Sequence, residues 1–286
     1  MNPILSFAST IARLLPMPLK RTLYRFSPLA RLIRSGLNRA APPGLVTIKV
    51  ASGGLAEMRL ELDLQTEKDY WLGTYEPELQ QAIAELVHPG TIAYDVGANI
   101  GYISLLLAQA VGAAGQVFAF EALPANLERL QKNITLNDLK GRVTIISGAV
   151  IDAARPVQFW VGPSGGMGKA EGSAGRQSIA YSEAITVQGL ALDEFVYTAG
   201  QPVPQVIKMD IEGGEILALP GMRRLLLQAR PLVFVELHGP EAAQVAWQTF
   251  LQAGYQVCKM EPGFPGIPAL EALDWKAYLV AIPFGK

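Results

Sequence analysis

The sequence predicts an α/β fold in which a largely parallel sheet is covered by helices on both faces. From residue 91 onward, short apolar runs alternate with amphipathic helical patterns, as expected when each helix returns the chain to the same edge of a sheet. Residues 96–120 contain no charge, but glycines and Asn99 interrupt them. This stretch is therefore better explained as a buried loop, helix, turn and strand than as a membrane span.

Composition excludes several classes of protein. The chain has 286 residues, is 50% hydrophobic and carries a formal charge of −1, which argues against disorder and against nucleic-acid binding. Its single cysteine, Cys258, rules out an internal disulfide and a cysteine-based zinc cluster. With only two histidines, a metal centre built on two or three histidines is nearly excluded, and no metal site is expected in the main interpretation. We expect a globular protein in a reducing, cytoplasmic compartment.

Residues 1–40 form a distinct basic segment, with seven Arg or Lys residues and no acidic residue. Apolar residues recur at helical spacing from Ile4 to Leu15, and Pro16 ends the pattern. The run is too short to span a bilayer. This basic amphipathic arm either lies on an anionic membrane surface, packs as a helical cap, or is an acid-poor targeting peptide. We expect three parts: the arm 1–40, a β-hairpin cap 41–75, and the main α/β domain 76–286.

The elements follow from local patterns. Alternating apolar residues on both sides of Ser52-Gly53-Gly54 predict a hairpin over 45–64. A helix is expected from Pro77 to Val87, before Pro89-Gly90. The following strands are predicted at 91–96, 116–120, 142–150, 203–209, 232–237 and 278–282, with helices at 100–111 and 124–137.

Two further segments complete the chain. The last strand is expected to pair with 255–259 as a hairpin and to form an antiparallel edge of the sheet. The glycine-rich segment 162–183 is expected to be mobile, as either a substrate lid or a surface insertion.

The segment from Tyr94 to Tyr102 closes a buried strand and opens a helix, which is where an open α/β sheet binds a nucleotide-like ligand. Gly97 permits the turn, and Gly101 permits close approach of a ligand. Asn99 and Tyr102 replace the small residues that a dinucleotide fingerprint requires. The Asp95 carboxylate would repel a phosphate but attract an ammonium or a sulfonium, and S-adenosylmethionine carries both.

Acidic residues follow three more strands. Glu121 is placed to accept hydrogen bonds from ribose hydroxyls, which suits NAD equally well. Asp210 and Glu212 could steer the methyl donor, orient a hydroxyl or hold a metal, and a capped helix start is the structural alternative. Glu236 and His238 share one side of their strand. We hypothesise that His238 or Asp210 accepts the acceptor's proton, oriented by Glu212 or Glu236.

The sequence resembles the FkbM-type S-adenosylmethionine-dependent methyltransferases from about residue 73 to residue 239. The motifs that carry the resemblance are Gly73-Thr74-Tyr75-Glu76-Pro77, Asp95–Gly101, Phe120-Glu121-Ala122, Asn133 with Leu136-Asn137, Leu192-Asp193, Ile207–Glu215 and Glu236-x-His238. Ala122 departs from the proline usual in the family.

The resemblance implies a class I methyltransferase (Rossmann-like) fold, whose seven-stranded, mostly parallel sheet has an antiparallel last strand. It also implies methyl transfer from S-adenosylmethionine to a hydroxyl of a carbohydrate, glycolipid or secondary metabolite. By position it implies that Asp95, Gly97, Asn99 and Gly101 hold the methionine end, Glu121 the ribose and Ala149 the adenine, while Tyr75 and Glu76 close over the donor or the acceptor.

Two other functions remain as alternatives. One is an NAD-dependent oxidoreductase on a related fold. The other is a catalytically silent nucleoside-binding module at a membrane. The sequence leaves the acceptor and the oligomeric state open.

Overall fold

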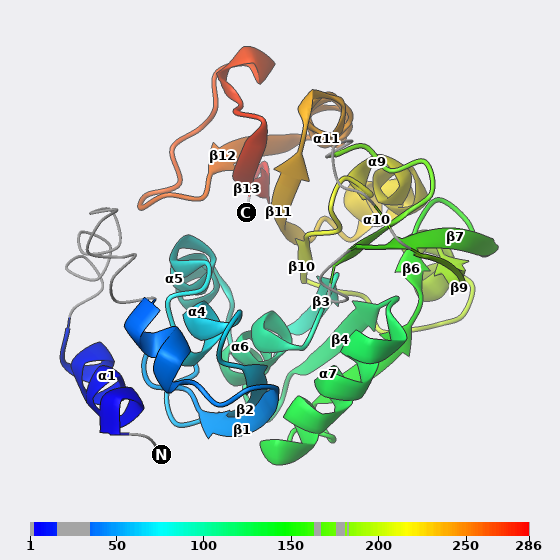
Figure 1. Ribbon diagram of the computed structural model, residues 1–286. Coiled ribbons are helices and arrows are strands. Elements are labelled where there is room, and N and C mark those ends of the chain that lie inside the picture. Colours follow the sequence, from blue (N-terminus) through cyan, green and yellow to red (C-terminus); the bar gives the residue numbers. More distant parts are fainter. Residues whose placement is uncertain (1–2, 16–34, 163–166, 176–180, 182, 286) are drawn as a thin grey trace. The chain divides into compact units, whose positions relative to one another are not determined.

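The computed structural model describes residues 3–15, 35–162, 167–175, 181 and 183–285. The chain divides into two compact units (Figure 1). The first comprises residues 1–80 and 135–138, and the second comprises 81–134 and 139–286. The predicted boundaries at residues 40 and 75 both fall inside the first unit.

The first unit contains the predicted hairpin. Strands β1 (Leu45–Lys49) and β2 (Arg59–Asp63) pair antiparallel, with Leu45 opposite Asp63, which confirms the prediction. The helices of this unit are α1 (Pro3–Leu14) and α4 (Lys68–Leu72), and α5 (Pro77–Leu86) contains the point of division. Among the residues described, no helix combines the length and the hydropathy needed to cross a bilayer.

The second unit is built on the predicted seven-stranded sheet. Its order is β12-β13-β11-β10-β3-β4-β5, and β13 runs antiparallel to both of its neighbours. The strands are β3 (Ile92–Val96), β4 (Gln116–Glu121), β5 (Val143–Ser147), β10 (Val206–Met209), β11 (Leu232–His238), β12 (Tyr255–Lys259) and β13 (Lys276–Pro283). The other central pairs are parallel, so the class I methyltransferase arrangement is confirmed.

One detail of the prediction is wrong: the last strand is not at the edge of the sheet. β13 lies between β11 and β12, and β12 forms the edge. The reason is visible in the burial of β13, where Leu279, Val280 and Ala281 are buried in succession. A strand with three consecutive buried residues has both faces covered, which suits an interior position.

Helices cover this sheet as predicted. α6 packs against β3 and β4, and α11 packs against β11 and β12 (Figure 1). The helices of the second unit are α6 (Tyr102–Val111), α7 (Pro124–Leu136), α8 (Leu192–Tyr197), α9 (Glu215–Ala218), α10 (Arg223–Gln228) and α11 (Pro240–Gln252), with 3₁₀ turns at Leu219–Met222 and Leu270–Ala272. The core includes the buried side chains of Tyr94, Phe120 and Phe250.

A second sheet was not predicted. It has the order β6-β9-β7-β8 and consists of β6 (Ala149–Val150), β7 (Pro156–Val161), β8 (Gly168–Ala170) and β9 (Glu183–Leu190). The predicted single strand 142–150 is therefore wrong. β5 pairs with β4 only as far as Ser147, and after Gly148 the chain pairs with β9 as β6. A Cβ at Gly148 would lie 2.7 Å from the Gln188 carbonyl oxygen, so only glycine allows this crossing.

The glycine-rich segment 162–183 is also partly corrected. Gly168–Ala170 pairs with Phe159–Val161, so this part forms regular structure, contrary to the expectation of a mobile loop. The Ala174 N–H donates to the Gly213 carbonyl at 2.9 Å, which fixes the following turn. Residues 163–166, 176–180 and 182 lie outside the described part of the chain.

Candidate active site

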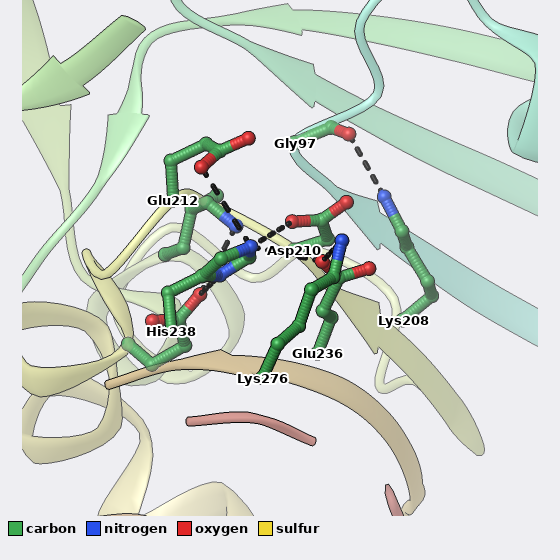
Figure 2. Close-up of polar contacts among 9 residues, drawn as sticks. Gly97, Lys208, Asp210, Glu212, Glu236, His238 and Lys276 are labelled. Atoms are coloured by element: carbon green, nitrogen blue, oxygen red, sulfur yellow. Dashed lines mark hydrogen bonds and ion pairs between the residues drawn. The ribbon is translucent and has the colours of Figure 1, made fainter. Parts of the chain in front are cut away.

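The loop between β3 and α6 is held by three buried side chains from other elements. Lys208 Nζ donates to the Gly97 carbonyl at 2.9 Å, and Asn133 Nδ2 donates to the Ile100 carbonyl at 2.8 Å. The Asn99 N–H donates to Glu121 Oε2 at 2.7 Å. These contacts fix the loop through its backbone, and Figure 2 shows the bond from Lys208.

Gly97 is required where this loop begins. Its φ is +79°, and a Cβ there would lie 2.0 Å from the Asp210 carbonyl oxygen. The loop after β3 and the residue after β10 are therefore in direct contact, as expected for the carboxyl ends of neighbouring parallel strands.

Two residues of the predicted donor site make internal contacts. The buried Asp95 carboxylate lies 3.2 Å from Lys208 Nζ through Oδ1 and accepts the Ser104 hydroxyl at 2.6 Å through Oδ2. Its charge is thus neutralised by Lys208. At Gly101 a Cβ would lie 2.5 Å from Leu130 Cδ1, so the missing side chain makes room for α7.

Glu121 is anchored at the end of β4. Its Oε1 accepts the N–H groups of Ala122 at 3.0 Å and Leu123 at 2.8 Å, while Oε2 accepts that of Asn99. Burial raises the pKa of Glu121, and these backbone donors act against that rise. A ribose hydroxyl bound here would have to share the carboxylate with backbone donors.

The remaining predicted donor residues are Ala149, Tyr75 and Glu76. Ala149 is buried in β6, directly after the break at Gly148. Tyr75 and Glu76 belong to the first unit, where the Tyr75 ring lies 4.3 Å from that of Tyr70. Their roles in binding stay predictions.

A cluster of charged side chains surrounds His238 at the carboxyl ends of β10 and β11, as Figure 2 shows. His238 Nε2 lies 2.8 Å from Glu236 Oε1, 3.6 Å from Glu212 Oε2 and 4.0 Å from Asp210 Oδ1. On the other side of the ring, Nδ1 lies 3.7 Å from Glu215 Oε1. The structure thus brings together the three residues predicted to be catalytic, Asp210, Glu212 and His238.

The surroundings of His238 favour its charged form. Burial alone lowers the pKa of the imidazole, but the carboxylates of Glu215, Glu236 and Asp210 around it raise it to about 10. For Glu236 the effect of burial is to raise the pKa. The nearby cations His238 and Lys276 outweigh this effect and hold the pKa of Glu236 below its usual value. At neutral pH the cluster therefore contains an imidazolium surrounded by carboxylates.

The members of the cluster differ in access to solvent. His238, Glu215 and Glu236 are buried. The side chains of Asp210 and Glu212 are 19% and 35% exposed. Because both imidazole nitrogens face carboxylates, the exposed carboxylates are the groups that an acceptor can reach.

Asp210, Glu236 and His238 could also hold a divalent cation. Each offers one ligand atom, these atoms lie within 4.8 Å of one another, and both ligand types suit such ions. However, Glu236 Oε1 is already in contact with the Lys276 ammonium and with His238 Nε2. These two cations of the protein neutralise the carboxylates that a metal would need.

Several residues of the site had no role in the sequence analysis. Lys208 and Glu215 lie within the Ile207–Glu215 motif and Asn133 within another, so the motifs pointed to them without showing what they contact. Lys276 had no signal, since nothing in the sequence shows that β13 places it beside Glu236.

A family can be assigned by comparison with known proteins. The chain matches the Methyltransferase FkbM domain over residues 95–257. It is similar to the hexuronic acid methyltransferase AglP of Haloferax volcanii, at 28% identity over 163 residues, 57% of this chain and 62% of that protein. The match therefore covers less than two thirds of that relative's length.

Among solved structures, the chain is similar to a methyltransferase FkbM from Methylobacillus flagellatus KT at 18% identity, with a TM-score of 0.44, over 76% of this chain and 54% of that one. It is also similar to an S-adenosylmethionine-dependent O-methyltransferase from Thermotoga maritima at 15% identity, with a TM-score of 0.41, over 73% of this chain and 66% of that one.

Proposed function

Because the chain belongs to the FkbM methyltransferase family, we propose that it transfers a methyl group from S-adenosylmethionine to a hydroxyl group of a carbohydrate. The observation that carries this proposal is the contact between the loop after β3 and the main chain of Asp210, a residue whose carboxylate is partly exposed. The hexuronic acid methyltransferase among the relatives supports a sugar acceptor. The single, buried Cys258 supports a reducing, cytoplasmic compartment.

The residues present fit the donor at the start of α6. This helix has no side-chain cap and no acidic residue in its first turn, so the positive end of its dipole favours an anionic group such as the donor's carboxylate. The loop residues Gly97, Asn99 and Gly101 would hold the methionine end there, and Glu121 would take the ribose by sharing its carboxylate. When bound, S-adenosylmethionine supplies a methyl group on a sulfonium, whose carbon–sulfur bond breaks to leave a thioether.

The protein's own contribution is alignment and proton removal. The acceptor's hydroxyl oxygen must face the methyl group in line with the breaking bond, and its proton must leave as the new carbon–oxygen bond forms. Between the two candidate bases, the geometry favours Asp210, since His238 is charged and both of its nitrogens face carboxylates. His238 then acts as a positioning residue, whose charge holds the partly exposed carboxylates of Asp210 and Glu212 in place.

Calorimetry and turnover together test this function. The purified chain should release or absorb heat with S-adenosylmethionine and S-adenosylhomocysteine, and should label a glycan fraction from radiolabelled donor. Asp210→Asn should reduce kcat about 100- to 10,000-fold while leaving donor affinity unchanged. Glu261→Gln, at an exposed carboxylate outside the cluster, is the matched control. Saturation by NADH without any response to the methyl donor would overturn the proposal.

The pH profile separates the two candidate bases. With Asp210 as the base, turnover should already be high at neutral pH. With His238 as the base, turnover should rise until the imidazolium loses its proton near pH 10.

A further inference from the structure

An exposed indole lies beside the charged cluster. Trp275 directly precedes β13, and its carbonyl accepts the Gly239 N–H at 2.7 Å, immediately after His238 at the end of β11. Its ring is nearly perpendicular to the imidazole of His238, at 79°, with the ring centres 6.3 Å apart. A Cβ on Gly239 would lie 3.6 Å from Trp275 Nε1, which places the indole over the end of β11.

The contact with His238 uses only part of this side chain, since Trp275 is 43% exposed. The cluster is therefore bordered by an aromatic ring as well as by carboxylates.

Aromatic surface combined with hydrogen-bonding carboxylates suits one class of small molecule. A pyranose ring presents C–H groups on its face, which pack on an aromatic ring, and hydroxyls at its rim, which donate to carboxylates. The four carboxylates outnumber the two cations, His238 and Lys276. The cluster should therefore attract the hydroxyl rim of a sugar and repel a carboxylate substituent, which must point away from it.

We infer that Trp275 is the platform on which a pyranose acceptor stacks, with the hydroxyl to be methylated directed at Asp210. This inference rests on the proposed methyl transfer and names the part of the site that selects the acceptor.

The test uses ligand-observed NMR to measure the binding of methyl glycosides (glucuronide, glucoside and galactoside). The protein is the full chain saturated with S-adenosylhomocysteine. Trp275→Ala should weaken binding about tenfold, while Trp275→Phe should retain most of it. The matched control is Trp160→Ala, because Trp160 is an exposed tryptophan in β7. With an identified acceptor, the Ala variant should raise the acceptor KM and leave donor affinity unchanged.

Two results would overturn the role of Trp275: no glycoside bound by the wild-type chain, or equal binding by wild type and both variants. Failure of the proposed function would differ, because the wild-type chain would then give no calorimetric response to S-adenosylhomocysteine.

A separate observation concerns α1. One face of this helix carries Phe7 and Leu14, which are 68% and 74% exposed, and the exposed Ile4 and Ile11 lie on the same face. The opposite face buries Leu5, Ser9 and Ala12. An amphipathic helix with large apolar side chains toward solvent, in a segment with seven basic and no acidic residues, matches the pattern of helices that lie in a lipid interface.

We propose that this face of α1 docks on an anionic phospholipid surface. The charge of residues 1–40 selects this occupant, since anionic lipids attract basic segments and neutral lipids do not.

Co-sedimentation of the full chain with vesicles tests the docking. Binding should occur with mixed phosphatidylcholine and phosphatidylglycerol, should be absent with phosphatidylcholine alone, and should weaken with salt. Phe7→Ser with Leu14→Ser should reduce it at least about tenfold. Leu227→Ser with Leu251→Ser, at exposed leucines of α10 and α11, should leave it unchanged. Equal binding to both kinds of vesicle, or by the Phe7/Leu14 variant, would overturn the proposal.

Discussion

Replacing Lys208 by methionine isolates the contact that joins β3, β10 and the donor loop. Lys208 and Asp95 are direct partners in the register of these two parallel strands, and both are buried. The ammonium lies 3.2 Å from Asp95 Oδ1 and donates to the Gly97 carbonyl. Methionine preserves the length and the packing of the side chain but removes its charge.

The expected cost comes from the carboxylate that is left behind. Removing one partner of a buried ion pair costs about 3–5 kcal/mol, because the other charge stays desolvated without compensation. Ser104 alone cannot provide that compensation. Urea unfolding of Lys208→Met should therefore show a loss of stability of about this size, and calorimetry should show weakened donor binding, since the Gly97 carbonyl loses its tether.

A double-mutant cycle provides the control. Asp95→Asn should also be destabilising, but the double variant should be more stable than the sum of the two losses implies, by a coupling energy of about 2 kcal/mol. A coupling energy near zero, or a single variant within about 0.5 kcal/mol of wild type, would refute the claim that this pair holds the loop.

Three further predictions follow from the same site. Gly97→Ala should destabilise the chain and abolish donor binding, because its Cβ would meet the Asp210 carbonyl at 2.0 Å. The control Gly141→Ala, whose Cβ would have no neighbour within 4 Å, should do neither, so equal thermal unfolding of the two variants would contradict the prediction. The free energy of unfolding should fall as pH rises from 6.5 toward 10, because the folded chain keeps a proton on His238 that the unfolded chain releases. The contribution of His238 to stability is complete below pH 6.5, and a curve that His238→Gln does not flatten would assign the effect elsewhere. Dialysis against EDTA should leave turnover unchanged, because His238 and Lys276 already neutralise Glu236, whereas a loss restored by Mg²⁺ would reveal a metal centre.

The order of helices and strands could be predicted because each rests on local patterns. Apolar runs gave the strands of the central sheet, and the glycine loop gave the position of its ligand-binding edge. The position of β13 could not be derived in the same way, since insertion between β11 and β12 depends on pairing between distant segments. The second sheet could not be predicted for a related reason. β8 contains only Gly168, Lys169 and Ala170, and such a short strand forms only because β7 supplies its hydrogen bonds.

The chemistry of the site could likewise be predicted only in part from the sequence. The sequence places Asp210, Glu212 and His238 at strand ends, so their proximity could be predicted from topology alone. The protonation of His238 could not, because its pKa depends on how many carboxylates converge on both ring nitrogens, and Glu215 reaches Nδ1 only through the fold of the loop after β10. A buried histidine with one carboxylate partner could keep a nitrogen for a substrate, whereas one enclosed by four is held as a cation. The proton acceptor must then be sought among the exposed members of the cluster, which leads to Asp210.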